Sequence, residues 1–205
     1  MINKKGILFV LSSPSGAGKT TLCKKILSLD KNLRMSISYT TRPKRRSEKN
    51  GKDYYFISND EFLKKKNKHE FIETATVFEN NYGTPKKFIQ ESISKGLDII
   101  FDIDWQGAQK LVNFSSANLV SIFILPPSTD ELKKRLKKRA EDTKETVEKR
   151  MSKAKSEISH WVEYDYVLVN DDLEKCVEQI LNIIKAERLK RVRQKNLFDH
   201  IEKFS

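Results

Sequence analysis

An apolar run, Ile7–Leu11, leads directly into a loop that contains Gly16 and Gly18 and ends in Lys19 and Thr20. This order of a buried strand, a glycine-rich loop and Lys-Thr at the start of a helix is typical of a phosphate-binding loop. The two glycines allow backbone N–H groups to turn toward an anion, and Lys19 adds a positive charge beside it. The sequence therefore predicts an α/β fold built around a loop that binds a nucleoside triphosphate.

The loop departs from the usual pattern at its first position, where Ser13 stands in place of a glycine. The helix expected after the loop supports the prediction, because it has an apolar face for packing on a sheet and its N-terminus attracts the same anion. Thr20 offers a hydroxyl toward the Mg²⁺ that accompanies a triphosphate. The expected ligands of the triphosphate are Ser13, Pro14, Ser15, Gly16, Ala17, Gly18, Lys19 and Thr20.

The charge balance favours anionic partners. Forty Lys and Arg residues against 28 Asp and Glu residues give a formal net charge of +12, but the basic residues are interleaved with acidic ones, so we do not expect nucleic acid to be a partner. Cys23 and Cys176 form no Cys-x-x-Cys pair, so the sequence indicates neither a disulfide framework nor a zinc site, and we expect both residues to pack as small apolar side chains. Ile7–Leu11 is too short to span a membrane, so we expect a soluble cytoplasmic protein.

Apolar strands alternate with helical patterns, which indicates a mainly parallel sheet flanked by helices. The candidate strands of this sheet are Ile7–Leu11, Leu97–Ile103, Leu119–Leu125 and Tyr166–Val169. After the first helix the pattern changes to short strands, which we interpret as an inserted β-rich unit, at Ile37–Thr41, Tyr54–Ile57 and Phe71–Thr76. Within it, Asn50-Gly51 predicts a hairpin turn, Ser58–Glu61 predicts a capping box, and 84–96 predicts a helix with Pro85 at its first position.

A second insertion begins after Pro126-Pro127. Ser128–Glu131 is another capping box and opens a basic helix, and the helical pattern continues, with a break near 140–143, to about His160. Because this segment contains few large apolar residues, we expect it to be exposed. A final amphipathic helix is predicted from about Asp172.

Two carboxylates follow the apolar strand segment Ile99–Phe101. Asp102 and Asp104 stand at its carboxyl end, where open α/β sheets bind ligands, and strand alternation places them on one side with Ile103 on the other. Two carboxylates beside a phosphate loop would repel its ligand unless a cation or a hydrogen-bond donor lies between them. Asp102 therefore suits a hydrated Mg²⁺, and Asp104 suits a substrate group rich in donors.

The segment Ser36–Arg46 supplies hydroxyl and guanidinium groups suited to a second phosphate. Together with the motifs around it, it makes the chain similar to the guanylate kinase family over nearly all of its length. Besides the phosphate loop, the motifs that carry this resemblance are Ser-x-Ser-x-Thr-Thr-Arg at Ser36–Arg42, Asp53-Tyr54, Phe71-Ile72-Glu73, Asn81-Tyr82-Gly83-Thr84, Asp102-Ile103-Asp104-Trp105-Gln106-Gly107, Pro126-Pro127-Ser128 and Val169-Asn170-Asp171-Asp172.

The resemblance implies that the β-rich unit binds GMP. The residues that would hold its phosphate are Arg42, Arg45 (with Arg46 as the alternative), Tyr54 and Tyr82, and those that would read guanine are Ser38, Glu73, Thr84 and Asp104. The chemistry agrees, because the N1–H and exocyclic amine of guanine are donors that match the carboxylates of Glu73 and Asp104, and its O6 is an acceptor that matches Ser38. Adenine would instead present a lone pair at N1.

The resemblance also implies a lid over residues 127–159, whose Arg135, Arg139 and Arg150 act with Lys19 on the transferring phosphoryl group. Asn170 matches the family position near the adenine of ATP. On this division, residues 1–35, 95–126 and 160–205 form the core phosphate-loop domain, and residues 36–94 form the GMP-binding insertion.

The expected activity is that of a guanylate kinase in purine nucleotide metabolism. It would use ATP and Mg²⁺ to convert GMP and dGMP to their diphosphates, and no protein partner is implied. A kinase for another monophosphate is a weaker alternative, because an AMP site has no use for two acceptors at Glu73 and Asp104. A non-catalytic guanylate-kinase-like module that binds a protein is also weaker, because such a module has no reason to keep Lys19, Asp102 and the lid arginines.

Overall fold

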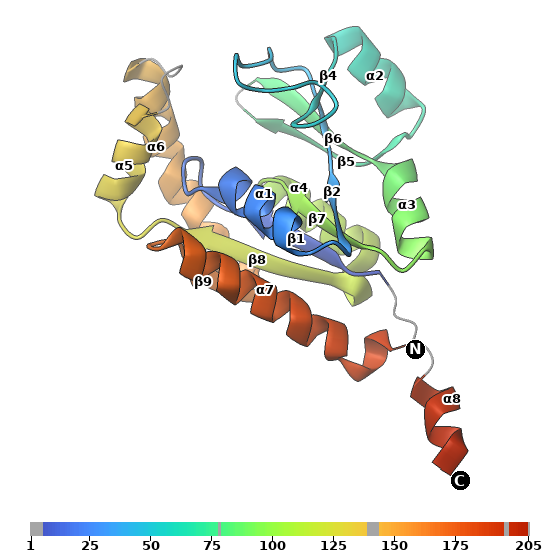
Figure 1. The fold of residues 1–205 in the computed structure, drawn as a ribbon. Helices are drawn as coiled ribbons and strands as arrows, with labels where there is room; N and C mark the ends of the chain where they lie inside the picture. Colours follow the sequence, from blue (N-terminus) through green and yellow to red (C-terminus); the bar gives the residue numbers. More distant parts are fainter. Residues whose placement is uncertain (1–5, 78, 139–143, 195–196, 205) are drawn as a thin grey trace.

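Five parallel strands form the central sheet, in the order β2-β7-β1-β8-β9 (Figure 1). Their bounds are β1 Leu8–Ser12, β2 Leu33–Ser36, β7 Asp98–Asp102, β8 Leu119–Leu125 and β9 Tyr166–Val169. The structure is a computed structural model and describes residues 6–77, 79–138, 144–194 and 197–204. The four strands predicted for the main sheet are confirmed within one or two residues at each end.

Strand β2 was not predicted, although it pairs with β7 along its whole length. Its sequence, Leu-Arg-Met-Ser, is short, and only Leu33 and Ser36 are buried, because β2 lies at the edge of the sheet. A half-buried edge strand of four residues gives too little apolar signal to be recognised without its neighbour.

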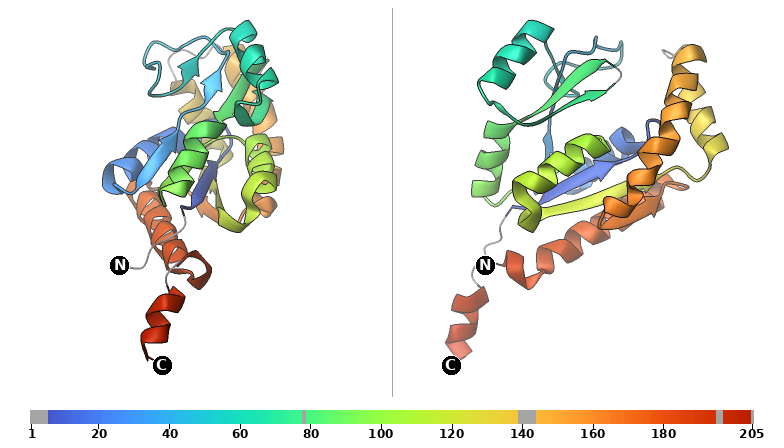
Figure 2. Two further views of the ribbon diagram at one scale, coloured as in Figure 1. Left: turned by 90° about the vertical axis from the view of Figure 1, so that its right-hand side faces the viewer. Right: turned by 180° about the vertical axis from the view of Figure 1, so that it is seen from behind.

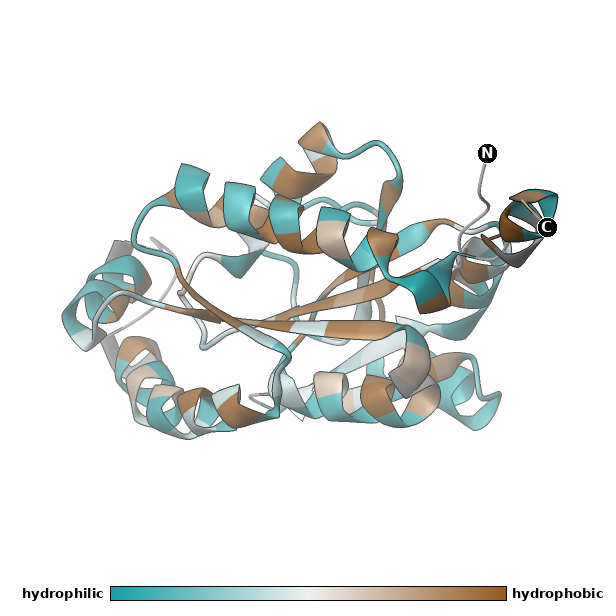
Figure 3. Ribbon diagram, turned by 90° about the horizontal axis from the view of Figure 1, so that it is seen from below, coloured by the Kyte–Doolittle hydropathy of each residue, from teal (hydrophilic) through white to brown (hydrophobic). Residues whose placement is uncertain are grey.

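Helices cover both faces of the central sheet, since alternate residues of a strand point to opposite faces. Phe9 and Leu11 of β1 pack with α1 (Lys19–Leu29) and α7 (Leu173–Leu189). Leu8 and Val10 pack on the other face with α3 (Lys86–Ser94) and α4 (Trp105–Ser115). In Figure 3 the central strands are accordingly coloured hydrophobic, while the helices change from hydrophobic to hydrophilic around their axes. Cys23 and Cys176 are buried and free in the first of these cores, as predicted.

The β-rich unit has its own sheet of four strands, in the order β4-β3-β6-β5. Its elements are β3 Tyr39–Thr40, β4 Tyr55–Phe56, α2 Asn59–Asn67, β5 Phe71–Val77 and β6 Asn80–Pro85. The predicted hairpin at Asn50-Gly51 is wrong, because β3 and β4 pair in parallel and the turn at Gly51 only reverses part of the long connection between them. The capping box at the start of α2 is confirmed, with Ser58 and Glu61 each bonding the other's backbone N–H.

Strand β6 was also not predicted, because its sequence contains Gly83 and Pro85, which are poor strand residues. It is held by antiparallel pairing to β5 over most of its length. Pro85 ends this strand and caps α3, which begins at Lys86, so the prediction that Pro85 is the first helical residue is wrong by one position.

Polar side-chain contacts help to connect the β-rich unit to the core. Lys24 on α1 forms a salt bridge with Asp53 at 2.7 Å, and the Lys110 ammonium on α4 donates to the carbonyl of Thr74 on β5. In Figures 1 and 2 the β-rich unit and the helices α5 and α6 rise on the same side of the core. The two insertions therefore stand over the same side of the sheet domain.

The second insertion consists of α5 (Thr129–Lys138) and α6 (Lys144–Ser159). The backbone N–H of Glu131 donates to the hydroxyl of Ser128, as the predicted capping box requires, but the Glu131 carboxylate accepts a hydrogen bond from Arg135. The expectation that this segment is exposed is wrong for one side of the pair. A small apolar cluster buries Leu132, Leu136, Val147 and Ala154 between the two helices.

Candidate functional site

The phosphate loop connects β1 to α1, as the sequence predicted. Gly16 and Gly18 have φ angles of 96° and 98°, in the left-handed region that favours glycine. A Cβ atom at Gly18 would lie 2.6 Å from the side-chain nitrogen of Asn170, and one at Gly16 would lie 2.9 Å from Leu136. Both glycines are thus required by conformation and by close packing. The loop itself is held by a turn in which the Ala17 N–H donates to the Pro14 carbonyl.

Lys19, Thr20 and Asp102 meet at the carboxyl edge of the sheet. The Lys19 ammonium lies 2.8 Å from one Asp102 oxygen and donates to the Ile103 carbonyl at 2.7 Å. The Thr20 hydroxyl donates to the other Asp102 oxygen at 2.7 Å. The predicted neighbourhood of Asp102 and the phosphate loop is therefore present, because β1 and β7 are adjacent strands.

Asn170 and Arg135 both contact the backbone of the phosphate loop at Ala17. The Asn170 amide donates to the Ala17 carbonyl at 2.7 Å and is buried. The Arg135 guanidinium donates to the carbonyls of Ala17 and Asn170, at 3.4 Å and 3.1 Å. These two side chains, which are distant in sequence, brace the same loop residue.

Three of the residues predicted to read guanine are buried in the β-rich unit: Ser38, Glu73 and Thr84. Glu73 on β5 and Thr84 on β6 are cross-strand partners, and the Thr84 hydroxyl donates to Glu73 Oε1 at 2.5 Å. Glu73 Oε2 is buried and has no hydrogen-bond partner among the residues that the structure describes. Burial raises the pKa of Glu73 to about 7, aided by the charge of Asp104 and opposed by the Thr84 hydrogen bond. A buried acceptor without a donor is costly, and a ligand that brings a donor would satisfy it.

Asp104 has a structural role that sequence reasoning did not predict. It lies beyond the end of β7, at the position before α4, and its Oδ1 accepts the backbone N–H of Gly107 at 3.0 Å. It is therefore the N-cap of α4. Its other oxygen is 3.3 Å from the side-chain amide of Gln106 and stays partly accessible. Strand β7 ends at Asp102, so the strand alternation used to place Asp104 beside Asp102 does not extend to Asp104. The cap nevertheless places the Asp104 carboxylate close enough to Glu73 to act on that residue's pKa.

The cationic part of the β-rich unit gathers around Arg42. The Arg42 guanidinium lies over the ring of Tyr54 at 5.5 Å, and the rings of Tyr54 and Tyr82 are 5.9 Å apart. Glu48, which sequence reasoning did not assign to the site, accepts from Arg42 at 2.7 Å and from the backbone N–H of Arg45 at 2.8 Å. Burial and the charge of Asp102 raise the pKa of Tyr54 well above its usual value, so its hydroxyl remains a donor.

Comparison with known proteins decides the family, since residues 5–187 match the sequence model of guanylate kinases. The chain belongs to the guanylate kinase family. It is 50% identical to the guanylate kinase of Novosphingobium aromaticivorans and 49% identical to that of Zymomonas mobilis, each over 200 residues, which is 98% of this chain and 90% and 93% of those relatives. The crystal structure of guanylate kinase from Anaplasma phagocytophilum has a TM-score of 0.85 and 42% identity, covering 98% of this chain and 96% of that one. The predicted fold class is thereby confirmed.

The arginines expected in the guanylate kinase lid are only partly placed by the structure. Arg135 is on α5 and contacts the phosphate loop as described, and Arg150 is on α6, where it is half-buried. Arg139 lies outside the described residues. The roles of these three residues remain predictions.

The donor set for the Mg²⁺ expected in a guanylate kinase is small. Within residues 6–77, 79–138, 144–194 and 197–204, no three His, Cys, Asp or Glu side chains are grouped so that they could hold a metal ion. Asp102 and Thr20 supply one carboxylate and one hydroxyl at 2.7 Å from each other. Because Mg²⁺ in nucleotide sites takes one or two protein oxygens and completes its shell with phosphates and water, this pair fits a Mg²⁺ that arrives with ATP.

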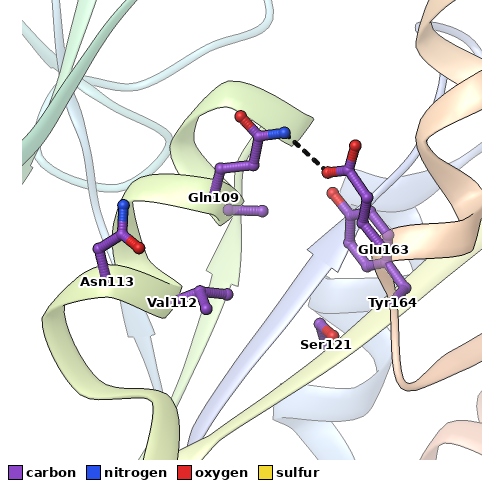
Figure 4. Close-up of a pocket in the computed structure, with 7 residues that line it drawn as sticks. Gln109, Val112, Asn113, Ser121, Glu163 and Tyr164 are labelled. Atoms are coloured by element: carbon purple, nitrogen blue, oxygen red, sulfur yellow. Dashed lines mark hydrogen bonds between the residues drawn. The ribbon is translucent and has the colours of Figure 1, made fainter.

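A separate groove of about 360 Å³ lies beside α4 and contains none of the predicted site residues. Figure 4 shows Gln109, Val112 and Asn113 on the α4 side, facing Glu163 and Tyr164, with a hydrogen bond of 2.8 Å from Gln109 to Glu163.

None of the helices in the described parts of the chain is both long and apolar enough to cross a bilayer.

Proposed function

We propose that this chain transfers the γ-phosphoryl group of ATP to GMP and dGMP, with Mg²⁺ bound alongside ATP. The chain is an ATP-dependent phosphotransferase by its membership of the guanylate kinase family. The observation that carries the choice of guanine is the buried second oxygen of Glu73, which accepts no hydrogen bond from any described residue. Guanine brings two adjacent donors, N1–H and the exocyclic amine, whereas adenine would place a lone pair against the same carboxylate.

The phosphate loop supports the ATP side of the proposal. Its residues 13–20 would surround the phosphates of ATP, with the N-terminus of α1 directed at them. Lys19 is held near this position by Asp102 and Ile103, and we infer that it turns toward the β- and γ-phosphate oxygens when ATP binds. Asn170 and Arg135 would hold the loop in shape from behind, with Asn170 also near adenine.

The monophosphate would be bound by Arg42, Arg45, Tyr54 and Tyr82. Arg42 is now neutralised by Glu48, and we infer that Glu48 keeps the guanidinium in place until the phosphate of GMP shares it. A planar guanidinium can hold two oxygens at once, and the Tyr54 hydroxyl can donate a third bond.

The mechanism needs no covalent intermediate on the protein. Phosphoryl transfer depends on alignment of the two nucleotides and on neutralising the charge of the transferring group. Lys19 and the arginines at 135, 139 and 150 would supply this positive charge, and bound Mg²⁺ would neutralise further charge on the ATP phosphates. Asp102 and Thr20 would hold that ion. The reaction would take place in the cytoplasm, where the free thiols of Cys23 and Cys176 persist.

The test is a substrate panel. GMP, dGMP, AMP, UMP and CMP are each offered with ATP and Mg²⁺, and ADP release is measured. We expect turnover with GMP and dGMP, and rates lower by at least about a hundredfold with the other three, since a site with unpaired buried polar groups rejects mismatched ligands strongly. Activity confined to AMP or the pyrimidines would overturn the proposal, and no activity with any monophosphate would favour a non-catalytic binding module.

A further inference from the structure

A carboxylate from α6 is bound to the phosphate loop. The backbone N–H of Ser15 donates to Glu157 Oε2 at 3.1 Å, between residues 142 positions apart in the sequence. Ser15 is the third residue of the loop, and such N–H groups are the ones that bind anions in phosphate loops. In this structure the anion on that N–H group is a side chain of the protein itself.

The electrostatic surroundings of Glu157 resemble those expected for a bound phosphate. Lys19 attracts the Glu157 carboxylate, as does Lys153 on the same helix, and Asp104 repels it. Burial works against the charged form and raises the pKa of Glu157. The carboxylate is therefore held in a partly desolvated place chiefly by the phosphate loop and its lysine, the groups that an ATP phosphate would also use.

Contacts other than that of Glu157 attach α6 to the rest of the molecule. The helix packs on α5 through Val147, Met151 and Ala154. Just after its C-terminal end, the ring of His160 stacks on Trp105 with a centroid distance of 3.6 Å, and Glu163 accepts a hydrogen bond from Gln109. A neutral side chain at position 157 would be sufficient for packing. Packing alone therefore does not explain why a carboxylate stands at this position.

We propose that Glu157 is a resident anion of the phosphate loop, which ATP displaces when it binds. Two anions cannot share the Ser15 N–H and the charge of Lys19 without repulsion, so the triphosphate and Glu157 compete. Glu157 thus lowers the affinity of the nucleotide-free enzyme for ATP. The contact between α6 and the loop then forms only while the nucleotide site is empty. This inference rests on the proposed function, because it takes the loop to be the ATP site.

The test compares the full-length protein with Glu157→Gln and Glu157→Ala. Binding of ATP with Mg²⁺, and separately of inorganic tripolyphosphate, is measured by calorimetry without GMP. We expect both ligands to bind about three- to tenfold more tightly to the variants, because a competing charge-assisted hydrogen bond has been weakened or removed. The effect should be at least as large for Ala as for Gln, since Gln can still accept from the Ser15 N–H.

Glu148→Gln is the matched control, because it removes the same charge from an exposed position on the same helix. Its affinities should stay within about twofold of the parent, so that a change in net charge alone is excluded. Unchanged or weaker binding by Glu157→Gln, in a protein whose melting temperature equals that of the parent, would overturn the proposal. Glu157 would then support the loop structurally without competing with ATP. GMP phosphorylation by the parent is assayed in parallel. Failure of that assay counts against the proposed function, whereas the tripolyphosphate affinities still decide the role of Glu157.

Discussion

The Thr84 hydroxyl donates to Glu73 Oε1 at 2.5 Å, and this bond fixes one oxygen of a carboxylate whose other oxygen has no hydrogen-bond partner in the described part of the chain. The two residues face each other across β5 and β6, so the antiparallel pairing itself sets the distance between them. Thr84 orients the carboxylate and leaves the second oxygen for a ligand. One cross-strand pair thus orients the carboxylate to which we assign base reading.

Replacement of Glu73 by Gln should remove guanine reading without harming ATP binding. One acceptor oxygen becomes an NH₂ group that opposes a donor of guanine, a buried mismatch that costs about 1–3 kcal/mol or more. We expect kcat/KM for GMP to fall at least about tenfold, with AMP still a poor substrate. Steady-state kinetics with each monophosphate, and calorimetry with ATP, measure both parts.

The control for this variant is Glu70→Gln, one residue before β5, where an exposed carboxylate pairs with Lys65. Its GMP kinetics should match those of the parent. If Glu73→Gln were to retain GMP efficiency within about twofold, against the tenfold expected from the mismatch, Glu73 would not be the residue that reads the base.

The ionisation of Glu73 makes the stability of the protein depend on pH. Its pKa is raised from the model-compound value of 4.5 to about 7 in the folded chain, so the folded state keeps a proton that the unfolded state releases. Stability from this group is therefore fully present below pH 4.5 and is lost as pH rises toward 7, by on the order of 3 kcal/mol at most. Urea unfolding of the parent and of Glu73→Gln between pH 5 and 8 measures the difference.

The Gln variant cannot ionise at this position, so its unfolding free energy should vary less steeply with pH over this interval than that of the parent. Parallel curves for the two proteins would mean that Glu73 is already ionised in the empty site. GMP binding should also release protons near pH 7 in the parent, because the donors of guanine favour the charged carboxylate. Calorimetry in buffers with different ionisation enthalpies reports that release, and the Gln variant corrects for protons lost by the GMP phosphate.

Sequence reasoning predicted the parts of the fold that have strong local signals. Ile7–Leu11 is a continuous apolar run, and Leu119–Leu125 is interrupted only by Ser121, a pattern typical of buried parallel strands. Strands β2 and β6 were missed because one lies at an edge and the other contains Gly83 and Pro85. Their strand conformation comes from pairing with β7 and β5, which is information that a single segment does not contain.

The site was predictable where a motif names the residue and less so where the fold brings distant residues together. Lys19, Thr20 and Asp102 meet as expected from the motif and the strand end. Glu48 and Glu157 were not predicted, because nothing in their local sequence distinguishes them from the other acidic residues of a strongly charged chain. Both bind groups that we assign to phosphate recognition, so a search for acidic partners of such groups would find them once the fold is known.

A buried ion pair joins the turn that follows α7 to the last part of that helix. Arg193 is 5% exposed and donates to Glu187 Oε2 at 2.5 Å, and the Tyr166 hydroxyl donates to the other Glu187 oxygen at 2.5 Å. Arg193→Met leaves a buried carboxylate without its main cation, which typically costs about 3–5 kcal/mol. We expect a clear fall in the midpoint of urea unfolding, with GMP kinetics unchanged at 25 °C in the fraction that remains folded.

Lys190→Met is the comparison, because Lys190 bonds the same carboxylate at 2.8 Å but its side chain is 56% exposed. An exposed partner contributes at most about 1 kcal/mol. Equal losses from the two substitutions would show that burial of Arg193 adds nothing to the pair.

Lys19→Met should abolish most of the activity and leave the fold intact. Lys19 lies against Asp102 and the Ile103 carbonyl in this structure, and the Thr20 hydroxyl still donates to Asp102 when the ammonium is gone. Loss of the charge would therefore raise the free energy of the transition state, in which negative charge develops on the β- and γ-phosphate oxygens. It would change the stability of the folded protein little. We expect kcat to fall by about two to four orders of magnitude, with GMP affinity within about threefold of the parent.

The matched substitution is Lys24→Met on the same helix, where the side chain is 63% exposed and pairs with Asp53. It removes one positive charge from α1 as well, so it controls for the field of the helix and for net charge. Its kcat should stay within a small factor, since an exposed ion pair contributes little. Thermal unfolding of both variants must overlay that of the parent within a few degrees for the comparison to be valid. If phosphoryl transfer takes place at this loop, removal of the Lys19 cation must slow it. A folded Lys19→Met protein with near-normal turnover would therefore show that the phosphoryl group is transferred elsewhere.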